Sequence, residues 1–251
     1  MALQYIDRGD YNVVIVGAAS GIGLQAARFL AAQGVRIAAV DRNREGVETA
    51  AKELGSKAIA RAADVADWKT VQSTIDGLAK ELGRIDALIN CAGITGKTNI
   101  PTHDVDIDDF DAVYRINLKG AFLLTKAVIP HMLPKKYGRI LHVASIAGKD
   151  GNAGMAAYSA TKAGLIGLVK VMGKDYAETG ITVNGLAPAV IRTPMVAALP
   201  QATIDYMTAK IPMHRCGELE EAAQLIGWIV SPACSFTTGF TFDLTGGRAV
   251  Y

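Results

Sequence analysis

The sequence predicts an α/β protein, a single doubly wound domain in which a parallel sheet of about seven strands carries helices on both faces. Apolar runs of strand length alternate with segments of helical periodicity from one end of the chain to the other. Half of the 251 residues are hydrophobic, which is enough to fill a large core. No linker, repeat or low-complexity segment interrupts this alternation, so we expect residues 1–251 to form one domain.

Seven apolar runs, several of them rich in β-branched residues, are typical of strands buried on both faces. In chain order these predicted strands are 11–16, 35–40, 57–63, 85–90, 139–144, 182–186 and 241–244. Helical patterns lie between them at 21–33, 45–54, 68–82, 107–132, 158–178 and 222–230. Gly34 is expected to end the first helix, and Pro130 is expected to break the fourth.

Charge and cysteine content exclude several classes of protein. The 26 Lys and Arg residues nearly balance the 24 Asp and Glu residues, which does not favour binding to nucleic acid or to a membrane surface. Cys91, Cys216 and Cys234 have the spacing of neither a disulfide framework nor a metal site, so we expect a reducing, cytoplasmic location. The N-terminus lacks a signal-peptide pattern, and no apolar run approaches the roughly 18 residues of a membrane span.

A glycine-rich turn follows the first predicted strand and opens the first predicted helix. Its glycines permit a tight turn and let backbone N–H groups approach a phosphate, and the helix N-terminus adds partial positive charge. A structural role is the alternative for such a turn, but its place between strand and helix favours Rossmann-type nucleotide binding. The residues expected to bind the cofactor here are Gly17, Ser20, Gly21, Ile22 and Gly23.

The end of the second predicted strand indicates which dinucleotide is bound. Asp41 follows the glycines by about 20 residues, where a carboxylate accepts hydrogen bonds from the adenosine ribose. It would repel the 2′-phosphate of NADP, whereas the neighbouring Arg42 could neutralise that phosphate. Both residues are predicted to contact the cofactor, and the carboxylate favours NAD over NADP.

A phenol and an ammonium four residues apart, Tyr158 and Lys162, are candidates for acid–base chemistry. On a helix, residues i and i+4 share one face, so both groups would point into the same space. A cation beside the phenol favours the phenolate, so we expect a lowered pKa for Tyr158. Ser145 could reach the same position from a strand end. Taken alone, such a pair is more typical of a solvated surface.

Competing chemistries have little support. The histidines lack metal-ligand spacing, so no metal is expected, and Ser145 lies outside a G-x-S-x-G elbow. His142 falls inside a strand, where packing is the favoured role. The acidic residues of 104–111 open the long helix, which indicates capping.

Six ordered motifs resemble those of the short-chain dehydrogenase/reductase family and cover nearly the whole chain. The glycine turn is similar to the family's T-G-x-x-x-G-I-G, with Val16 replacing threonine, and Cys91 and Ala189 replace the usual asparagine and glycine of two later motifs. The resemblance implies a catalytic set and further cofactor contacts. The catalytic set is Asn117, Ser145, Tyr158 and Lys162. The cofactor contacts are Asp64, Val65, Asn90, Ala92, Gly93, Tyr158, Lys162, Pro188, Ile191 and Thr193.

The resemblance also implies how these residues work. Tyr158 would exchange a proton with the substrate oxygen during hydride transfer, and Ser145 would hold that oxygen. Lys162 would lower the pKa of Tyr158 and hold the nicotinamide ribose, while Asn117 would support Lys162 through a water. A non-catalytic nucleotide-sensing protein with the same fold is a remote alternative, since all four residues are present.

The substrate is less well determined. Residues 195–215, bracketed by prolines, are expected to form a lid. Lys149, Asn152 and Arg192, together with Ser145 and Tyr158, are the predicted substrate residues, and their cations suit a carboxylate. The C-terminal tail resembles that of relatives acting on sugars and sugar acids, which suggests a sugar, sugar acid or hydroxy acid and a role in carbohydrate metabolism. Reduction of a 3-oxoacyl thioester is the alternative.

Family members are usually tetramers that pack the long helix and the tyrosine-bearing helix against symmetry mates. Small residues on the second of these helices permit close approach, so the resemblance implies a homotetramer. They include Ala156, Ala157, Ala160, Ala163, Gly164 and Gly167.

Overall fold

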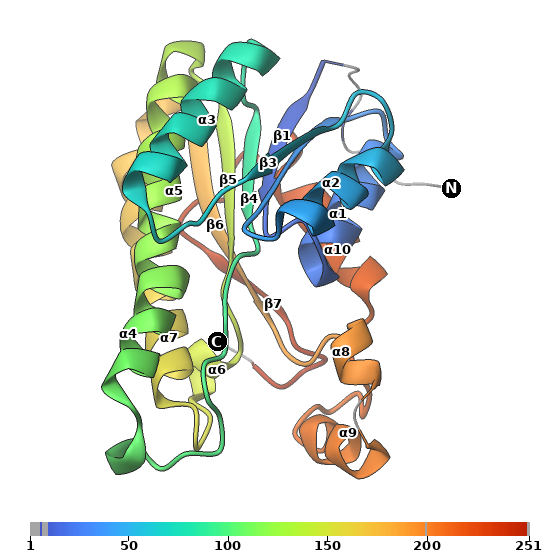
Figure 1. Cartoon of the computed structure of the whole chain (residues 1–251), viewed down its shortest axis with the longest axis vertical. Helices are drawn as coiled ribbons and strands as arrows, with labels where there is room; N and C mark the ends of the chain where they lie inside the picture. Colours follow the sequence, from blue (N-terminus) through green and yellow to red (C-terminus); the bar gives the residue numbers. More distant parts are fainter. Residues whose placement is uncertain (1–5, 7–9, 199, 250–251) are drawn as a thin grey trace.

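The centre of the fold is a seven-stranded parallel sheet in the order β3-β2-β1-β4-β5-β6-β7 (Figure 1). The computed structural model describes residues 6, 10–198 and 200–249 of the chain. In sequence order the strands are β1 (Asn12–Val16), β2 (Arg36–Asp41), β3 (Ile59–Ala62), β4 (Ala87–Asn90), β5 (Gly138–Val143), β6 (Ile181–Pro188) and β7 (Thr241–Leu244). Every predicted strand is therefore present, with ends that differ by a few residues.

Helices cover both faces of the sheet, as the alternation along the sequence predicts (Figure 1). One layer comprises α1 (Gly21–Ala31), α2 (Arg44–Leu54) and α10 (Leu219–Ile229). The other comprises α3 (Trp68–Leu82), α4 (Ile107–Tyr114), α5 (Gly120–Met132) and α7 (Ala156–Asp175). Three short helices that the sequence did not predict lie beyond the carboxyl ends of the strands, namely α6 (Ala147–Asp150), α8 (Pro194–Ala197) and α9 (Gln201–Thr208).

Strand β1 shows why continuous apolar runs form these strands. Its side chains alternate between the two helical layers, with Val14 and Val16 in one core cluster and Val13 and Ile15 in the other. All four are at most 1% exposed. Burying each such side chain stabilises the fold by about 1.5–3 kcal/mol, so a polar residue at any of them would be costly.

The strand order places a crevice at the carboxyl ends of β1 and β4. From β1 the chain builds outward through β2 to β3, and then crosses back to the other side of β1 at β4. The loops that follow β1 and β4 consequently diverge, and ligands of doubly wound sheets bind at this switch point. The glycine turn and the segment that begins at Asn90 both start here.

The predicted break of the long helix near Pro130 is wrong. Helix α5 continues through Pro130 to Met132. Pro130 is exposed in the last turns, where the carbonyl that loses its N–H partner can bond water instead. The interruption lies earlier, at a π-helical segment, Arg115–Lys119, which joins α4 to α5 and contains Asn117. Such π-helical turns occur frequently at functional sites.

Candidate active site

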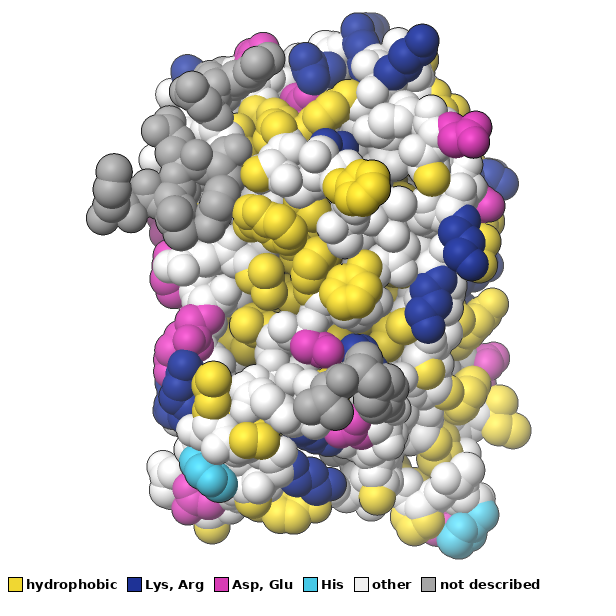
Figure 2. Space-filling view, turned by 180° about the vertical axis from the view of Figure 1, so that it is seen from behind, with side chains coloured by type: hydrophobic (Ala, Val, Ile, Leu, Met, Phe, Trp, Pro, Cys, Tyr) yellow, Lys and Arg dark blue, Asp and Glu magenta, His cyan; other side chains and the backbone are white. Residues whose placement is uncertain are grey.

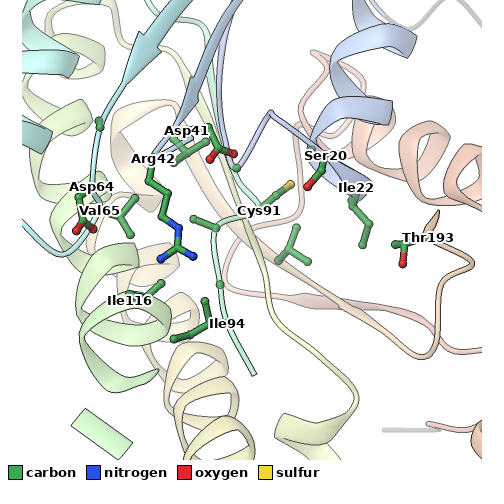
Figure 3. A pocket seen from close by; sticks show the side chains of 18 residues that line it. Ser20, Ile22, Asp41, Arg42, Asp64, Val65, Cys91, Ile94, Ile116 and Thr193 are labelled. Atoms are coloured by element: carbon green, nitrogen blue, oxygen red, sulfur yellow. The ribbon is translucent and has the colours of Figure 1, made fainter. Parts of the chain in front are cut away.

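An open pocket of about 360 Å³ lies at the switch point of the sheet (Figure 3). Twelve of the residues predicted to bind a cofactor line it. They are Gly17, Ser20, Gly21, Ile22, Gly23, Asp41, Arg42, Asp64, Val65, Ala92, Gly93 and Thr193. The tertiary structure thus gathers residues from five separate segments of the chain around one cavity.

The glycine turn at one wall of the pocket requires its glycines. Gly17 and Gly21 have φ angles of 80° and 55°, which β-carbon-bearing residues rarely adopt. A β-carbon at Gly23 would lie 2.2 Å from the carbonyl oxygen of Gly17. The Ser20 hydroxyl makes no capping bond to α1, which leaves N–H groups of the first helical turn available to an anion.

Asp41 at the end of β2 supports the turn from the side. One carboxylate oxygen accepts a hydrogen bond from the backbone N–H of Ala19 at 3.1 Å, and the other accepts from Asn43 at 2.9 Å. Figure 3 shows Asp41 at the rim and the exposed Arg42 side chain extending into the pocket. A carboxylate and a guanidinium therefore stand side by side where an adenosine ribose would enter.

Behind the pocket, His142 of β5 holds Asn90 at the end of β4. The Asn90 amide donates to His142 Nδ1 over 3.2 Å, while its carbonyl oxygen accepts from the N–H of Ala92 at 3.1 Å. His142 Nδ1 is therefore the acceptor, and Nε2 carries the proton toward Thr125 Oγ1 at 2.8 Å. Burial, and then the charge of Lys162, lowers the pKa of His142 to about 3, so this histidine is neutral. The predicted packing role is confirmed, and it extends to the pocket loop.

Asn117 fixes the next part of the same loop. Its side chain accepts from the N–H of Ile94 and donates to the carbonyl of Ile94, each over 2.8 Å. A β-carbon at Gly93 would lie 3.2 Å from Asn117 Oδ1 and 3.4 Å from Lys162 Nζ. The pocket therefore adjoins the predicted acid–base residues at Gly93.

Ser145, Tyr158 and Lys162 meet beside this point. Tyr158 and Lys162 lie one turn apart on α7, and the Lys162 ammonium lies 5.7 Å from the centre of the Tyr158 ring. The ammonium donates a hydrogen bond to the carbonyl of Val143 at 2.7 Å. Ser145, which follows β5, contributes a hydrogen bond that stabilises the Tyr158 phenolate.

The expected lowering of the Tyr158 pKa is wrong. Burial raises the pKa of Tyr158, and the hydrogen bond from Ser145 lowers it only in part. Burial also lowers the pKa of Lys162 to about 8, an effect that the nearby Cys91 opposes. The reason is geometric, because the Lys162 ammonium, itself 4% exposed, is bonded to a β5 carbonyl and lies 5.7 Å from the centre of the Tyr158 ring.

The predicted substrate residues are held by other protein groups. Lys149 of α6, only 8% exposed, pairs with Asp243 of β7 at 2.9 Å. The exposed Arg192 lies near the end of β6 and pairs with Glu218 at 3.3 Å. Asn152 lies in the loop between α6 and α7 and accepts a hydrogen bond from Arg248.

Several predicted cofactor residues, Pro188 and Ile191 among them, are not part of the pocket lining. The Pro188 carbonyl accepts from the N–H of Ile146, and the buried Ile191 bridges to Gly217. Sequence reasoning missed other residues that line the pocket. Ala63, Ile94 and Ile116 each adjoin a predicted residue, so adjacency could have found them, whereas Val143 carried no such signal.

One of the acidic residues at the start of the long helix caps it, as predicted. Asp106 accepts a hydrogen bond from the N–H of Asp108 at 2.9 Å at the start of α4. Among the described residues, no group of three or more His, Cys, Asp or Glu side chains could hold a metal ion. In the same part of the chain, no helix has the length and apolar character to cross a membrane.

Comparison with known proteins decides the family. The profile described as short chain dehydrogenase matches residues 11–203. The chain belongs to the short chain dehydrogenase family. Its pocket, its parallel sheet and the order of its motifs agree with this membership, and the protein is an oxidoreductase.

Individual relatives within the family differ in substrate. A 2-dehydro-3-deoxy-L-rhamnonate dehydrogenase (NAD(+)) of Sphingomonas sp. is 42% identical over 238 residues, covering 95% of each chain. A 3-oxoacyl-[acyl-carrier-protein] reductase of Thermotoga maritima is 36% identical, covering 94% of this chain and 97% of the relative. The solved structure of an NAD+-bound xylitol dehydrogenase has a TM-score of 0.90 and 33% identity, covering 95% of this chain and 98% of that one.

Proposed function

We propose that this protein is an NAD-dependent dehydrogenase that interconverts a secondary alcohol and a ketone on a small sugar acid or a related sugar or hydroxy acid. The observation that carries the proposal is the meeting of Ser145, Tyr158 and Lys162 beside a pocket whose rim presents Asp41. The similarity to an NAD(+)-dependent sugar-acid dehydrogenase supports both the cofactor and the substrate class.

The residues present fit a dinucleotide. Gly17 and Gly23 leave a surface without side chains beside the N-terminus of α1, where phosphates would bind to backbone N–H groups. The Asp41 carboxylate would hold the adenosine ribose and disfavour a 2′-phosphate. NAD, when bound, supplies the hydride acceptor or donor.

The chain's own groups would then move the proton. In the oxidation direction Tyr158 Oη takes the proton of the substrate hydroxyl, and in reduction it returns a proton to the oxygen. The Ser145 hydroxyl positions the same oxygen and stabilises its negative charge. Lys162, fixed by Val143, adds positive charge near the phenolate. A Tyr158→Phe protein that retains full activity would refute this assignment.

A screen of substrates tests the function as a whole. Purified protein would be supplied with NAD and a set of sugar acids, sugars and hydroxy acids, and separately with NADPH and 3-oxoacyl thioesters. We expect turnover of an acid from the first set. The alternative function is favoured by the 3-oxoacyl reductase relative, and turnover of thioesters alone would establish it.

We further propose that the protein is a cytoplasmic homotetramer that acts in carbohydrate metabolism. Large apolar side chains are exposed along the α4, α5 and α7 layer, with Ile107 77% and Val171 55% exposed. The face of the molecule seen from behind in Figure 2 also carries a group of apolar side chains. Exposed apolar surfaces of this kind mark interfaces. Light scattering at micromolar concentration would test the assembly, and a monomer mass would contradict it.

A further inference from the structure

We propose that Arg248, in the segment that follows β7, is a positioning residue for the loop between α6 and α7 and thereby for the substrate. The loop comprises residues 151–155. It follows α6, which begins two residues after Ser145, and the loop ends three residues before Tyr158. It is thus flanked along the chain by both residues that would hold the reacting oxygen. This inference rests on the proposed function only in taking this side of Tyr158 as the substrate side.

Arg248 makes two directed hydrogen bonds here, one to the last residue of α6 and one to the loop. Its Nε donates to Asp150 Oδ2 over 2.9 Å, and its Nη2 donates to Asn152 Oδ1 over 3.1 Å. The Arg248 side chain is only 9% exposed, while Asp150 is 30% exposed. Such a charge-assisted pair, largely removed from solvent, is stronger and more directional than a surface ion pair. The two bonds therefore hold one guanidinium against the end of α6 and the start of the loop.

The loop passes this constraint to the tyrosine-bearing helix. The backbone N–H of Asn152 donates to Ser159 Oγ over 3.1 Å, and Ser159 is the neighbour of Tyr158 in the first turns of α7. On its other side the loop is held by a hydrogen bond from the N–H of Ile100 to the carbonyl of Gly154 at 3.3 Å. Asn152 consequently links Arg248 to the start of α7: its side chain accepts from Arg248, and its backbone N–H donates to Ser159.

A second bond between the same two parts of the fold lies nearby. Lys149 of α6 pairs with Asp243 of β7 at 2.9 Å. The end of β7 and the segment after it therefore hold the α6 region at two places. Asp243 and Arg248 are five positions apart in the chain, and their carboxylate and ammonium partners, Asp150 and Lys149, are adjacent. Within the loop a turn hydrogen bond joins the N–H of Met155 to the carbonyl of Asn152, and we infer that the contacts from Arg248 and Asp243 set the position of the loop as a whole.

The test compares Arg248→Met with Arg248→Lys. Methionine keeps much of the apolar stem and removes both hydrogen bonds, whereas lysine keeps the charge and one donor position. For Arg248→Met we expect the KM for the substrate to rise about tenfold or more, with the KM for NAD changed less than about twofold. Arg248→Lys should lie between this variant and the wild type. Hydrogen exchange of the amides of 147–155 should accelerate in Arg248→Met.

Arg28→Met is the matched control. Arg28 also makes a double hydrogen bond to a carboxylate, that of Glu53, but it joins α1 to α2 away from the loop. We expect its KM values to equal those of the wild type. An unchanged substrate KM in Arg248→Met, or equal losses for NAD and substrate together with a lower melting temperature, would overturn the proposal. If the wild type used only 3-oxoacyl thioesters, the proposed function would fail, and the same comparison with that substrate would still test Arg248.

Discussion

The ammonium of Lys162 donates a hydrogen bond to the carbonyl oxygen of Val143 over 2.7 Å. This bond ties the predicted acid–base pair on α7 to the carboxyl end of β5. Lys162 is 4% exposed, so its charge is held in a poorly solvated position. A buried cation costs folding free energy, which a protein tolerates where the charge serves its function.

Replacing Lys162 with methionine should stabilise the protein and abolish its activity. The pKa of Lys162 is about 8 in the folded state against 10.5 ordinarily, so the unfolded chain binds more protons between these pH values. Stability of the wild type should therefore rise with pH in that window and be reduced below it by about 3 kcal/mol. Loss of the Val143 bond offsets about 1 kcal/mol of this.

Urea unfolding of the cofactor-free proteins at pH 7 and pH 10 would measure the effect. We expect Lys162→Met to be the more stable protein at pH 7 and to lose most of this advantage at pH 10. A variant that is less stable than the wild type at both pH values would contradict the role of burial.

Removing the Ser145 hydroxyl should move the pH dependence of oxidation to higher pH. Burial raises the pKa of Tyr158 and the hydrogen bond from Ser145 lowers it, so Ser145→Ala should have the higher tyrosine pKa. Oxidation requires the phenolate, and its rate therefore rises as the pH passes this pKa. We also expect kcat to fall by about 100-fold, because a group that holds the reacting oxygen is lost.

Rate profiles from pH 6 to pH 11 for the wild type and Ser145→Ala would test this prediction. Ser145→Thr retains a hydroxyl and serves as the control, with a profile closer to that of the wild type. A profile of Ser145→Ala that coincides with the wild type after scaling would mean that Ser145 does not influence Tyr158.

Asp41→Ser should relax the choice of cofactor. Loss of the carboxylate removes a ribose acceptor and the repulsion of a 2′-phosphate, and Arg42 is already directed into the pocket (Figure 3). We expect the KM for NAD to rise on the order of 10-fold and turnover with NADP to become measurable. Kinetics with both cofactors at saturating substrate would measure the change.

Asp41→Asn separates charge from support. The amide keeps one acceptor oxygen for the backbone N–H groups of Ala19 or Asn43, which both bond to Asp41. We expect Asp41→Asn to retain more stability than Asp41→Ser. Turnover with NADP should become measurable in both variants. Strict NAD use by both variants would show that selectivity resides elsewhere.

His142 should make the protein sensitive to mild acid. Its folded pKa is about 3 and its ordinary value 6.5, so the native state excludes a proton that the unfolded chain binds below pH 6.5. Stability due to His142 is complete above pH 6.5 and is lost as the pH falls toward 3. Between pH 7 and pH 5 the loss should be about 2 kcal/mol.

His142→Asn removes the titrating group while keeping a polar side chain opposite Asn90. Its unfolding free energy should fall less than that of the wild type from pH 7 to pH 5. Equal losses in the two proteins would show that other groups dominate the acid response.

The fold and the cofactor turn follow from local patterns in the chain. Continuous β-branched runs such as 13–16 can be buried only between two layers, which determines strand and sheet type. Gly23 can be read from sequence because only glycine fits against the Gly17 carbonyl. Tyr158 and Lys162 are four residues apart, and helical geometry alone puts them on one face. Such properties depend on spacing and backbone sterics, which a sequence displays directly.

The partners of the charged groups were decided only by the tertiary structure. Asp243 lies 94 residues from Lys149, and Arg248 lies 96 residues from Asn152. Val143 holds Lys162 through a backbone carbonyl, a group that every residue carries and that no sequence pattern distinguishes. The substrate residues expected from charge alone therefore have protein partners. Pairing of this kind depends on atomic distances between distant segments, which are set only when the whole sheet and its helical layers have packed.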